Sequence, residues 1–166
     1  MSTLVLHTAR LRLVLETTEA VLARIESMSP ADRAEVSPDW LARVRTSAAP
    51  SSWTHGFALV ERATGAAVGS CGFKEPPGPD GAVEIAYGVD PAYRGRGYAR
   101  EAAAALVELA LHDDRVRIVR AHTRPENGPS ARVLAACGFE RASEVLDPED
   151  GLVWRWELVA PERRPA

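Results

Sequence analysis

Residues 84–101 read EIAYGVDPAYRGRGYARE, and this stretch predicts a strand, a glycine-rich turn and the start of a helix. In the strand, large apolar side chains alternate with Glu84, Ala86 and Gly88, so one face carries a carboxylate beside two small residues. Pro91 then ends the ladder, because proline has no N–H group to donate. The stretch therefore predicts open space over the small-residue face of a strand.

The turn contains two glycines, Gly95 and Gly97, that are free to adopt positive φ. Apolar residues recur at helical spacing after it, so the turn opens onto a helix N-terminus. Unpaired N–H groups, the positive end of the helix dipole and nearby arginines all favour a bound anion there. The candidate phosphate-binding residues are Arg94, Gly95, Arg96, Gly97, Tyr98, Ala99 and Arg100.

This loop matches neither of two common glycine signatures. A dinucleotide fingerprint needs a third glycine, and a P-loop needs a lysine followed by Ser or Thr. The stretch instead resembles the acyl-CoA loop of the GNAT N-acetyltransferases: Gln or Arg, two residues, Gly, one residue, then Gly or Ala. Arg94, Gly97 and Ala99 fit that pattern. The alternative is a surface turn that is merely rich in Arg and Gly.

Length and composition indicate one domain with a buried core. The chain has 166 residues, 46% of them hydrophobic, and a net charge of -3, which argues against a general nucleic-acid surface. The apolar runs are short and the start lacks the long apolar core of a secretory signal, so we expect no membrane span and a cytoplasmic location. We expect a single domain over residues 1–166. The two cysteines and the scattered histidines predict neither a disulfide framework nor a metal site.

The rest of the chain alternates between strand and helix patterns. Strands are expected at residues 11–15, 57–61, 67–73, 83–89, 116–123, 140–146 and 152–159, and helices from Thr17 or Thr18 to residue 28, from about residue 39 to 44, after the glycine turn, and after Asn127. Strand, helix and strand around the glycine turn make a βαβ unit, so residues 83–89 and 116–123 should be parallel neighbours.

A second motif, RPENGPSARVLAACGF, covers residues 124–139. Asn127 predicts a helix N-cap, and Gly138 predicts a helix stop. Asn, two residues, Ser and a short helix ending in Gly-Phe also resembles the second GNAT signature, in the branch of the RimJ and RimL ribosomal-protein acetyltransferases. The two signatures occur in the family's order, with a strand between them.

This resemblance implies the family's fold and its cofactor. The expected fold is α/β (α+β): the GNAT acyl-CoA N-acyltransferase fold, with a mixed, twisted sheet of about seven strands, helices on both faces and two splayed central parallel strands. The thioester of acetyl-CoA lies in the gap between those two strands. Pro91, just past the Glu84 strand, is compatible with such a splay, because pairing cannot easily continue there.

The reaction implied by the resemblance needs a base. An amine with a pKa of about 10.4 is neutral in only about one molecule in two or three thousand at pH 7. Glu84 is the candidate base, acting through a water, and we expect burial to raise its pKa. The alternative is a solvated or salt-bridged strand glutamate. Tyr87 should point to the opposite face of the strand.

Other residues are expected to hold the cofactor and its leaving group. Backbone N–H groups near Gly88 and Val89 would polarise the thioester carbonyl. Asn127 would bond the pantetheine amide or act only as a cap, and these roles are compatible. Many family members place a tyrosine acid where this chain has Leu134, so Ser130 becomes the candidate donor to the thiolate; alternatively its hydroxyl bonds a backbone group in the first helical turn.

The sequence thus predicts acetyl transfer from acetyl-CoA to a primary amine, which is a protein N-terminus, an amino acid or another small amine. Two other classes stay open: a catalytically silent acyl-CoA-binding or sensing module, and an interaction domain whose loop is coincidental. The expected partner is the amine acceptor, with neither nucleic acid nor membrane, and a homodimer is one open state of assembly. The tryptophans could line an acceptor pocket, although strand spacing favours the core: Trp40, Trp53, Trp154 and Trp156.

Overall fold

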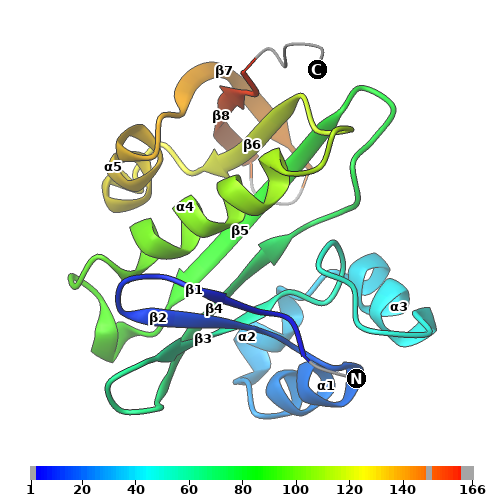
Figure 1. Cartoon of the computed structure of the whole chain (residues 1–166). Helices are drawn as coiled ribbons and strands as arrows, with labels where there is room; N and C mark the ends of the chain where they lie inside the picture. The colour runs from blue at the N-terminus through cyan, green and yellow to red at the C-terminus, as the bar shows by residue number, and fades with distance from the viewer. Residues whose placement is uncertain (1–2, 149–150, 162–166) are drawn as a thin grey trace.

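The computed structural model describes residues 3–148 and 151–161, and within them the strands form one mixed sheet of eight, in the order β1-β2-β3-β4-β5-β6-β8-β7 (Figure 1). The strands are β1 (Val5–His7), β2 (Leu11–Leu15), β3 (Phe57–Glu61), β4 (Ala67–Phe73), β5 (Ala82–Val89), β6 (Ile118–Thr123), β7 (Glu140–Asp147) and β8 (Gly151–Val159). The helices are α1 (Thr18–Glu26), α2 (Pro30–Ala34), α3 (Pro38–Thr46), the 3₁₀ helix η1 (Pro91–Tyr93), α4 (Tyr98–Leu111) and α5 (Gly128–Ala136). The predicted mixed α/β sheet is confirmed, with eight strands instead of about seven.

Two of these elements carry little sequence signal. Strand β1 precedes the strand expected to be first and has only three residues, too few to show alternation. Helix α2 buries none of its residues, so it has no apolar periodicity; it is set by Ser29, whose Oγ accepts from the backbone N–H of Asp32 at 3.2 Å, and by Pro30 in its first turn. Strand β6 begins at Ile118, two residues later than expected.

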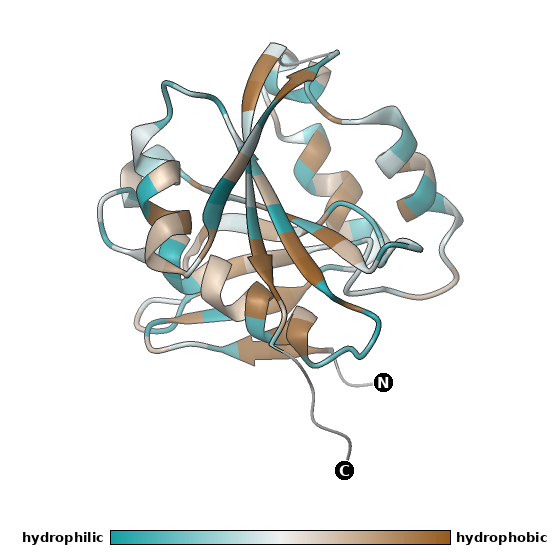
Figure 2. Ribbon diagram, turned by 90° about the horizontal axis from the view of Figure 1, so that it is seen from above, coloured by the Kyte–Doolittle hydropathy of each residue, from teal (hydrophilic) through white to brown (hydrophobic). Residues whose placement is uncertain are grey.

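Helix α4 covers one face of the sheet. Its buried stripe includes Ala102, Ala103 and Leu106, which join the main core with the inward residues of β2, β3, β4 and β5. Alanine at these positions lets the helix approach the sheet closely. Figure 2 shows the expected alternation of apolar and polar residues along the strands and around the helices.

Helices α1, α2 and α3 gather near the ends of β3 and β4, away from α5 (Figure 1). Val21 and Ile25 of α1 and Val44 of α3 form a second, smaller core cluster. Residues of α1 and α3 line a cavity together with Ala86 and Gly88, which lie on the face of β5 opposite the one that α4 covers. The expected placement of helices on both faces is therefore confirmed.

The parallel pair of strands, β5 and β6, is joined over a short distance only. Its ladder ends at the pair of Glu84 with Arg120, whereas β5 stays paired with β4 as far as Val89 and β6 stays paired with β8 as far as Thr123. The predicted splay is confirmed. Pro91 does not set the splay, because the two strands part well before the chain reaches it and each strand follows its antiparallel neighbour.

His55 is a fully buried polar residue that joins the segment after α3 to α1. Its Nδ1 accepts from the backbone N–H of Ser51 at 3.1 Å, so Nε2 carries the hydrogen and donates to Oγ1 of Thr18 at 2.9 Å. Burial lowers the pKa of His55 below its ordinary value, and the charges of Glu16 and Glu19 oppose this only in part.

We predict that protonation of His55 makes the protein less stable in mild acid. Because the folded pKa lies below the unfolded value of about 6.5, the unfolded chain binds more protons as the pH falls below 6.5, and stability is lost progressively down to the folded pKa. Melting temperatures of wild type and His55→Gln between pH 7.5 and 5 should show a shallower decline in the variant. His112 is exposed, so His112→Gln is the control. An equal fall of melting temperature with pH in all three proteins would contradict the role given to His55.

Candidate active site

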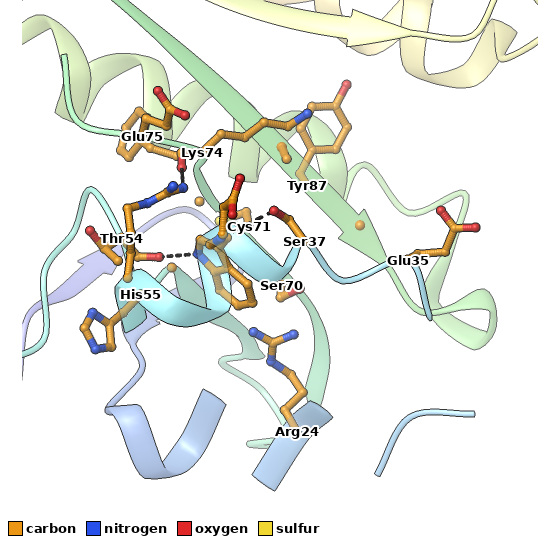
Figure 3. Close-up of a pocket in the computed structure, with 18 residues that line it drawn as sticks. Arg24, Glu35, Ser37, Thr54, His55, Ser70, Cys71, Lys74, Glu75 and Tyr87 are labelled. Atoms are coloured by element: carbon orange, nitrogen blue, oxygen red, sulfur yellow. Dashed lines mark hydrogen bonds between the residues drawn. The ribbon is translucent and has the colours of Figure 1, made fainter. Parts of the chain in front are cut away.

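A cavity of about 560 Å³ lies between helices α1 and α3 and strands β4 and β5 (Figure 3). The face of β5 that carries Ala86 and Gly88 opens into it. A Cβ built on Gly88 would have no heavy atom within 4 Å. The predicted open space over the small-residue face of this strand is confirmed. Of the tryptophans, Trp40 lines the cavity, while Trp53, Trp154 and Trp156 pack into the main core.

Glu84 lies on the same face of β5, at the point where β5 and β6 part. Its Oε2 is 2.8 Å from Nζ of Lys74 and 3.0 Å from Nδ1 of His122, and the side chain is 24% exposed. Burial acts to raise the pKa of Glu84, but the hydrogen bonds from His122 and Lys74, together with the charge of Lys74, outweigh it and hold the pKa below its ordinary value. The expected rise in pKa is therefore wrong.

His122 of β6 links Glu84 to the neighbouring strand β8. Nε of Arg155 donates to Nε2 of His122 at 3.1 Å, so Nδ1 of the ring carries the hydrogen that is donated to Glu84. Lys74 and His122 are site residues that sequence reasoning missed. Strand pairing could have identified Lys74. It directly follows β4, and its backbone N–H bonds the carbonyl of Glu84 on the adjacent strand at 3.0 Å.

The glycine loop has the predicted geometry. Gly95 and Gly97 have φ of 79° and 84°. Gly97 is the N-cap of α4, and no side chain caps this helix end. The first N–H groups of α4 and the positive end of its dipole are thus presented at the loop, as an anion site requires.

The side chains around this loop have partners of their own. Nε of Arg94 donates to the carbonyl of Val89 at 3.0 Å, and Nη1 of Arg96 lies 3.7 Å from Glu61. Tyr98 is buried and its hydroxyl donates to Glu61, so only its main-chain N–H can face a ligand. The loop therefore offers a ligand mainly its backbone, with Arg94 and Arg96 as nearby charge.

Arg10 reaches the loop from the turn between β1 and β2, and sequence reasoning missed it. Its Nε donates to Oε2 of Glu101 in α4 at 2.6 Å, and Oγ1 of Thr8 donates to the other carboxylate oxygen at 2.7 Å. A Cβ built on Gly97 would come within 2.8 Å of Nη2 of Arg10. These contacts fix the loop against the edge of the sheet.

Helix α5 begins beside the gap. Oδ1 of Asn127 accepts from the backbone N–H of Ser130 at 3.2 Å, so the predicted N-cap is confirmed. The hydroxyl of Ser130 lies 2.9 Å from the hydroxyl of Tyr87. Tyr87 lies on the opposite face of β5 from Glu84, as expected; its hydroxyl contacts α5, and the residue is also at the border of the cavity. Leu134 is fully buried in the core and takes no part in the site.

Burial raises the pKa of Tyr87 above its ordinary value, against the opposing effect of the Ser130 bond. The phenol therefore keeps its proton throughout the neutral range. Within residues 3–148 and 151–161, no helix is long and apolar enough to cross a membrane, and no three His, Cys, Asp or Glu side chains gather as ligands for a metal.

The sequence matches the model of the acetyltransferase (GNAT) domain family over residues 7–140. The N-acetyltransferase p20 of Bacillus licheniformis, itself uncharacterized, is 28% identical over 93 residues, which cover 56% of this chain and 52% of p20. The uncharacterized N-acetyltransferase YjdG of Bacillus subtilis is 32% identical over 89 residues, which cover 52% of this chain and 53% of YjdG. The matches thus span about half the length of these curated relatives.

Solved structures share the fold. A GNAT acetyltransferase from Bacillus anthracis superposes with a TM-score of 0.72 at 20% identity, covering 94% of this chain and 98% of that one. The ribosomal-protein-S5-alanine acetyltransferase of Vibrio fischeri has a TM-score of 0.73 at 16% identity, covering 98% and 100%. RimL in complex with coenzyme A has a TM-score of 0.71 at 15% identity, covering 95% and 98%. The family match covers most of the chain and agrees with the parted strands and the glycine loop, so the chain belongs to the GNAT acetyltransferase family.

Proposed function

We propose that this protein transfers an acetyl group from acetyl-CoA to a primary amine by direct attack on the thioester. The observation that carries the proposal is the gap between β5 and β6, which has the glycine loop at one end and a cavity of about 560 Å³ beside it. A silent acyl-CoA-binding module would need the loop and the gap but not an acceptor cavity beside a carboxylate. Family membership argues against the third class, in which the loop is coincidental.

The cofactor is proposed to bind mainly through backbone groups. The N–H groups at the start of α4 would hold the pyrophosphate, with Arg94, Arg96 and Arg100 adding charge. Gly88 and Val89, on the edge of β5 that no longer pairs with β6, would bond the pantetheine arm and polarise the thioester carbonyl. Asn127 uses its carbonyl oxygen as the cap, which leaves its N–H groups for the pantetheine amide.

Glu84 is proposed to accept the proton of the attacking amine through a water. Since its pKa is held low, the side chain is a carboxylate throughout the neutral range, ready to attract an ammonium group. The low pKa also makes it a weaker base than the sequence suggests, so water must pass the proton on to solvent. The ion pair with Lys74 also fits the alternative that Glu84 is only a salt-bridged strand residue.

Ser130 is proposed to protonate the leaving thiolate. A thiol has a pKa near 8.5, so the thiolate leaves readily and needs modest help. The Ser130 hydroxyl is free of the backbone N-cap bond, which Asn127 makes, and it contacts Tyr87 at 2.9 Å. Tyr87 is therefore placed to return a proton to Ser130.

The cavity lining carries charges of both signs. Arg24 and Lys74 are paired with carboxylates, and Arg43 donates to the carbonyl oxygen of Lys74 at 2.8 Å. Glu35, Asp39 and Glu75 have no ion-pair partner within the described residues and are proposed to attract an ammonium group. Structural neighbours are named for different acceptors, among them a ribosomal protein, an aminoglycoside and spermidine. We propose a protein N-terminus, an amino acid or another small amine, and membership of the RimJ and RimL branch on the strength of the Asn127 and Ser130 motif. The single domain over residues 1–166, the cytoplasmic location and the assembly state stay predictions.

We predict that Gly97→Val weakens acetyl-CoA binding roughly 100-fold or more, because strain at positive φ and displacement of the backbone donors together cost about 3 kcal/mol. Gly65→Val is the matched control, since Gly65 has a similar φ of 74° in the turn between β3 and β4, with nothing within 4 Å of its added Cβ. Calorimetric titration should show wild-type affinity for Gly65→Val only. Unchanged acetyl-CoA affinity in Gly97→Val would show that the loop is not part of the cofactor site.

We expect Glu84→Gln to lower turnover by roughly 10²- to 10⁴-fold with little change in acetyl-CoA affinity. The loss should shrink as the pH rises, because the amine then deprotonates without help. Glu75→Gln, which changes a carboxylate in the cavity lining, is the control and should act on the acceptor KM more than on turnover. A wild-type rate for Glu84→Gln at pH 7 would show that Glu84 forms a structural ion pair and does not act as the base.

For the leaving group, we expect Ser130→Ala to lower the single-turnover rate about 10-fold, with acetyl-CoA affinity and melting temperature near wild type. Tyr87→Phe should have a similar effect, and the double variant should be no slower than the slower single variant, because both hydroxyls serve one proton path. A lowered melting temperature with unchanged single-turnover rates would show that the hydroxyl pair is structural.

A further inference from the structure

Lys74 is the only lysine among the 166 residues of the sequence. It lines the cavity (Figure 3). Its side chain is 57% exposed, and its Nζ lies 2.8 Å from Oε2 of Glu84. Its position is fixed by the sheet, because its backbone N–H bonds the carbonyl of Glu84 at 3.0 Å. The one lysine side chain of the protein thus places a primary amine against the carboxylate that is proposed to serve acceptors.

An acceptor in this reaction needs a place in the cavity, a group to take its proton and a path to the thioester. Lys74 has the first two, since Nζ occupies the position beside Glu84 that an acceptor ammonium would take. The third depends on reach. Glu84 and Gly88 are about 13 Å apart along β5 at the usual rise per residue, and the flexible four-carbon stem of Lys74 supplies several Å of this. Attack by Lys74 therefore requires that the lysine swing along the strand and that the thioester lie on the Glu84 side of Gly88.

We propose that the protein acetylates its own Lys74. The proposal rests on the proposed function, because it uses the same thioester and the same base. The Nζ ammonium gives one proton to Glu84 through water, its freed lone pair forms a bond to the thioester carbon, and the C–S bond breaks. The second proton that the nitrogen loses as the amide forms passes to the CoA thiolate, so one acetyl group of about 42 Da is added to the chain.

Acetylation changes the site that performs it. The amide of acetylated Lys74 carries no charge, so Glu84 loses its ion pair and one of the two contacts that hold its pKa low. An external acceptor and Lys74 compete for the same carboxylate, so a bound acceptor displaces Nζ. Self-acetylation should therefore slow when a good acceptor is present.

The test uses the whole protein with acetyl-CoA and no added amine. A lysine-specific protease cuts the unmodified chain once, after Lys74, and cannot cut the acetylated chain. Intact mass should rise by about 42 Da, and cleavage should be lost in step with that gain. Peptide mapping separates this product from acetylation of the N-terminal amine. Lys74→Arg keeps the positive charge but has no amine to acetylate. Peptides that cover residues 63–94 of this variant should therefore carry no acetyl group.

Two further arms separate catalysis at the site from chemical acetylation. Glu84→Gln should modify Lys74 at least about 10-fold more slowly than wild type. Wild type unfolded in urea gives the uncatalysed rate, which should be slower still. A rate in the folded wild type that equals either of these would overturn the proposal.

Failure of this inference is distinguishable from failure of the proposed function. If Lys74 stays cleavable while acetyl-CoA binds and an added amine is acetylated, self-acetylation is wrong and the proposed function stands. If acetyl-CoA neither binds nor supports transfer to any amine, the proposed function is wrong, and self-acetylation falls with it. Acetylation of Lys74 that an added acceptor slows would support both.

Discussion

The site depends on the separation of two strands in the middle of the sheet. After the pair of Glu84 with Arg120, β5 continues beside β4 and β6 continues beside β8, so the facing edges of β5 and β6 no longer exchange hydrogen bonds. Backbone N–H and C=O groups inside a protein need partners, and leaving them unpaired costs free energy. A gap of this kind is therefore suited to a ligand that carries amide groups of its own, as the pantetheine arm does.

Charge around Glu84 follows from the same separation. The carboxylate lies where the strands part, and Lys74 from the β4 side and His122 from the β6 side both reach it. Arg155 fixes the tautomer of His122 from β8. The resulting low pKa makes Glu84 a permanent anion at neutral pH rather than a strong base. In the proposed reaction, Glu84 would therefore select an ammonium group and orient it beside the thioester as much as it removes a proton.

Local chemistry was enough to predict the parts of the fold that are set within a few residues. The alternation of large apolar residues with small or acidic ones predicted β5. The two glycines predicted the loop before α4, and Asn127 predicted the cap of α5. Short or exposed elements such as β1 and α2 gave no pattern to detect. The partners of Glu84 and Tyr87 come from residues distant in sequence, which become neighbours only through strand register and the docking of α5, so the lowered pKa and the hydroxyl pair could not be predicted.

The central claim is that the thioester lies in the gap between β5 and β6, and a crystal structure with acetyl-CoA bound measures this most directly. The account predicts that the pyrophosphate contacts the backbone at Gly95 and Gly97, that the thioester carbonyl accepts a hydrogen bond from the backbone of Gly88 or Val89, and that the sulfur faces Ser130. A pantetheine arm that lies outside the gap, with the thioester remote from Glu84, would contradict it.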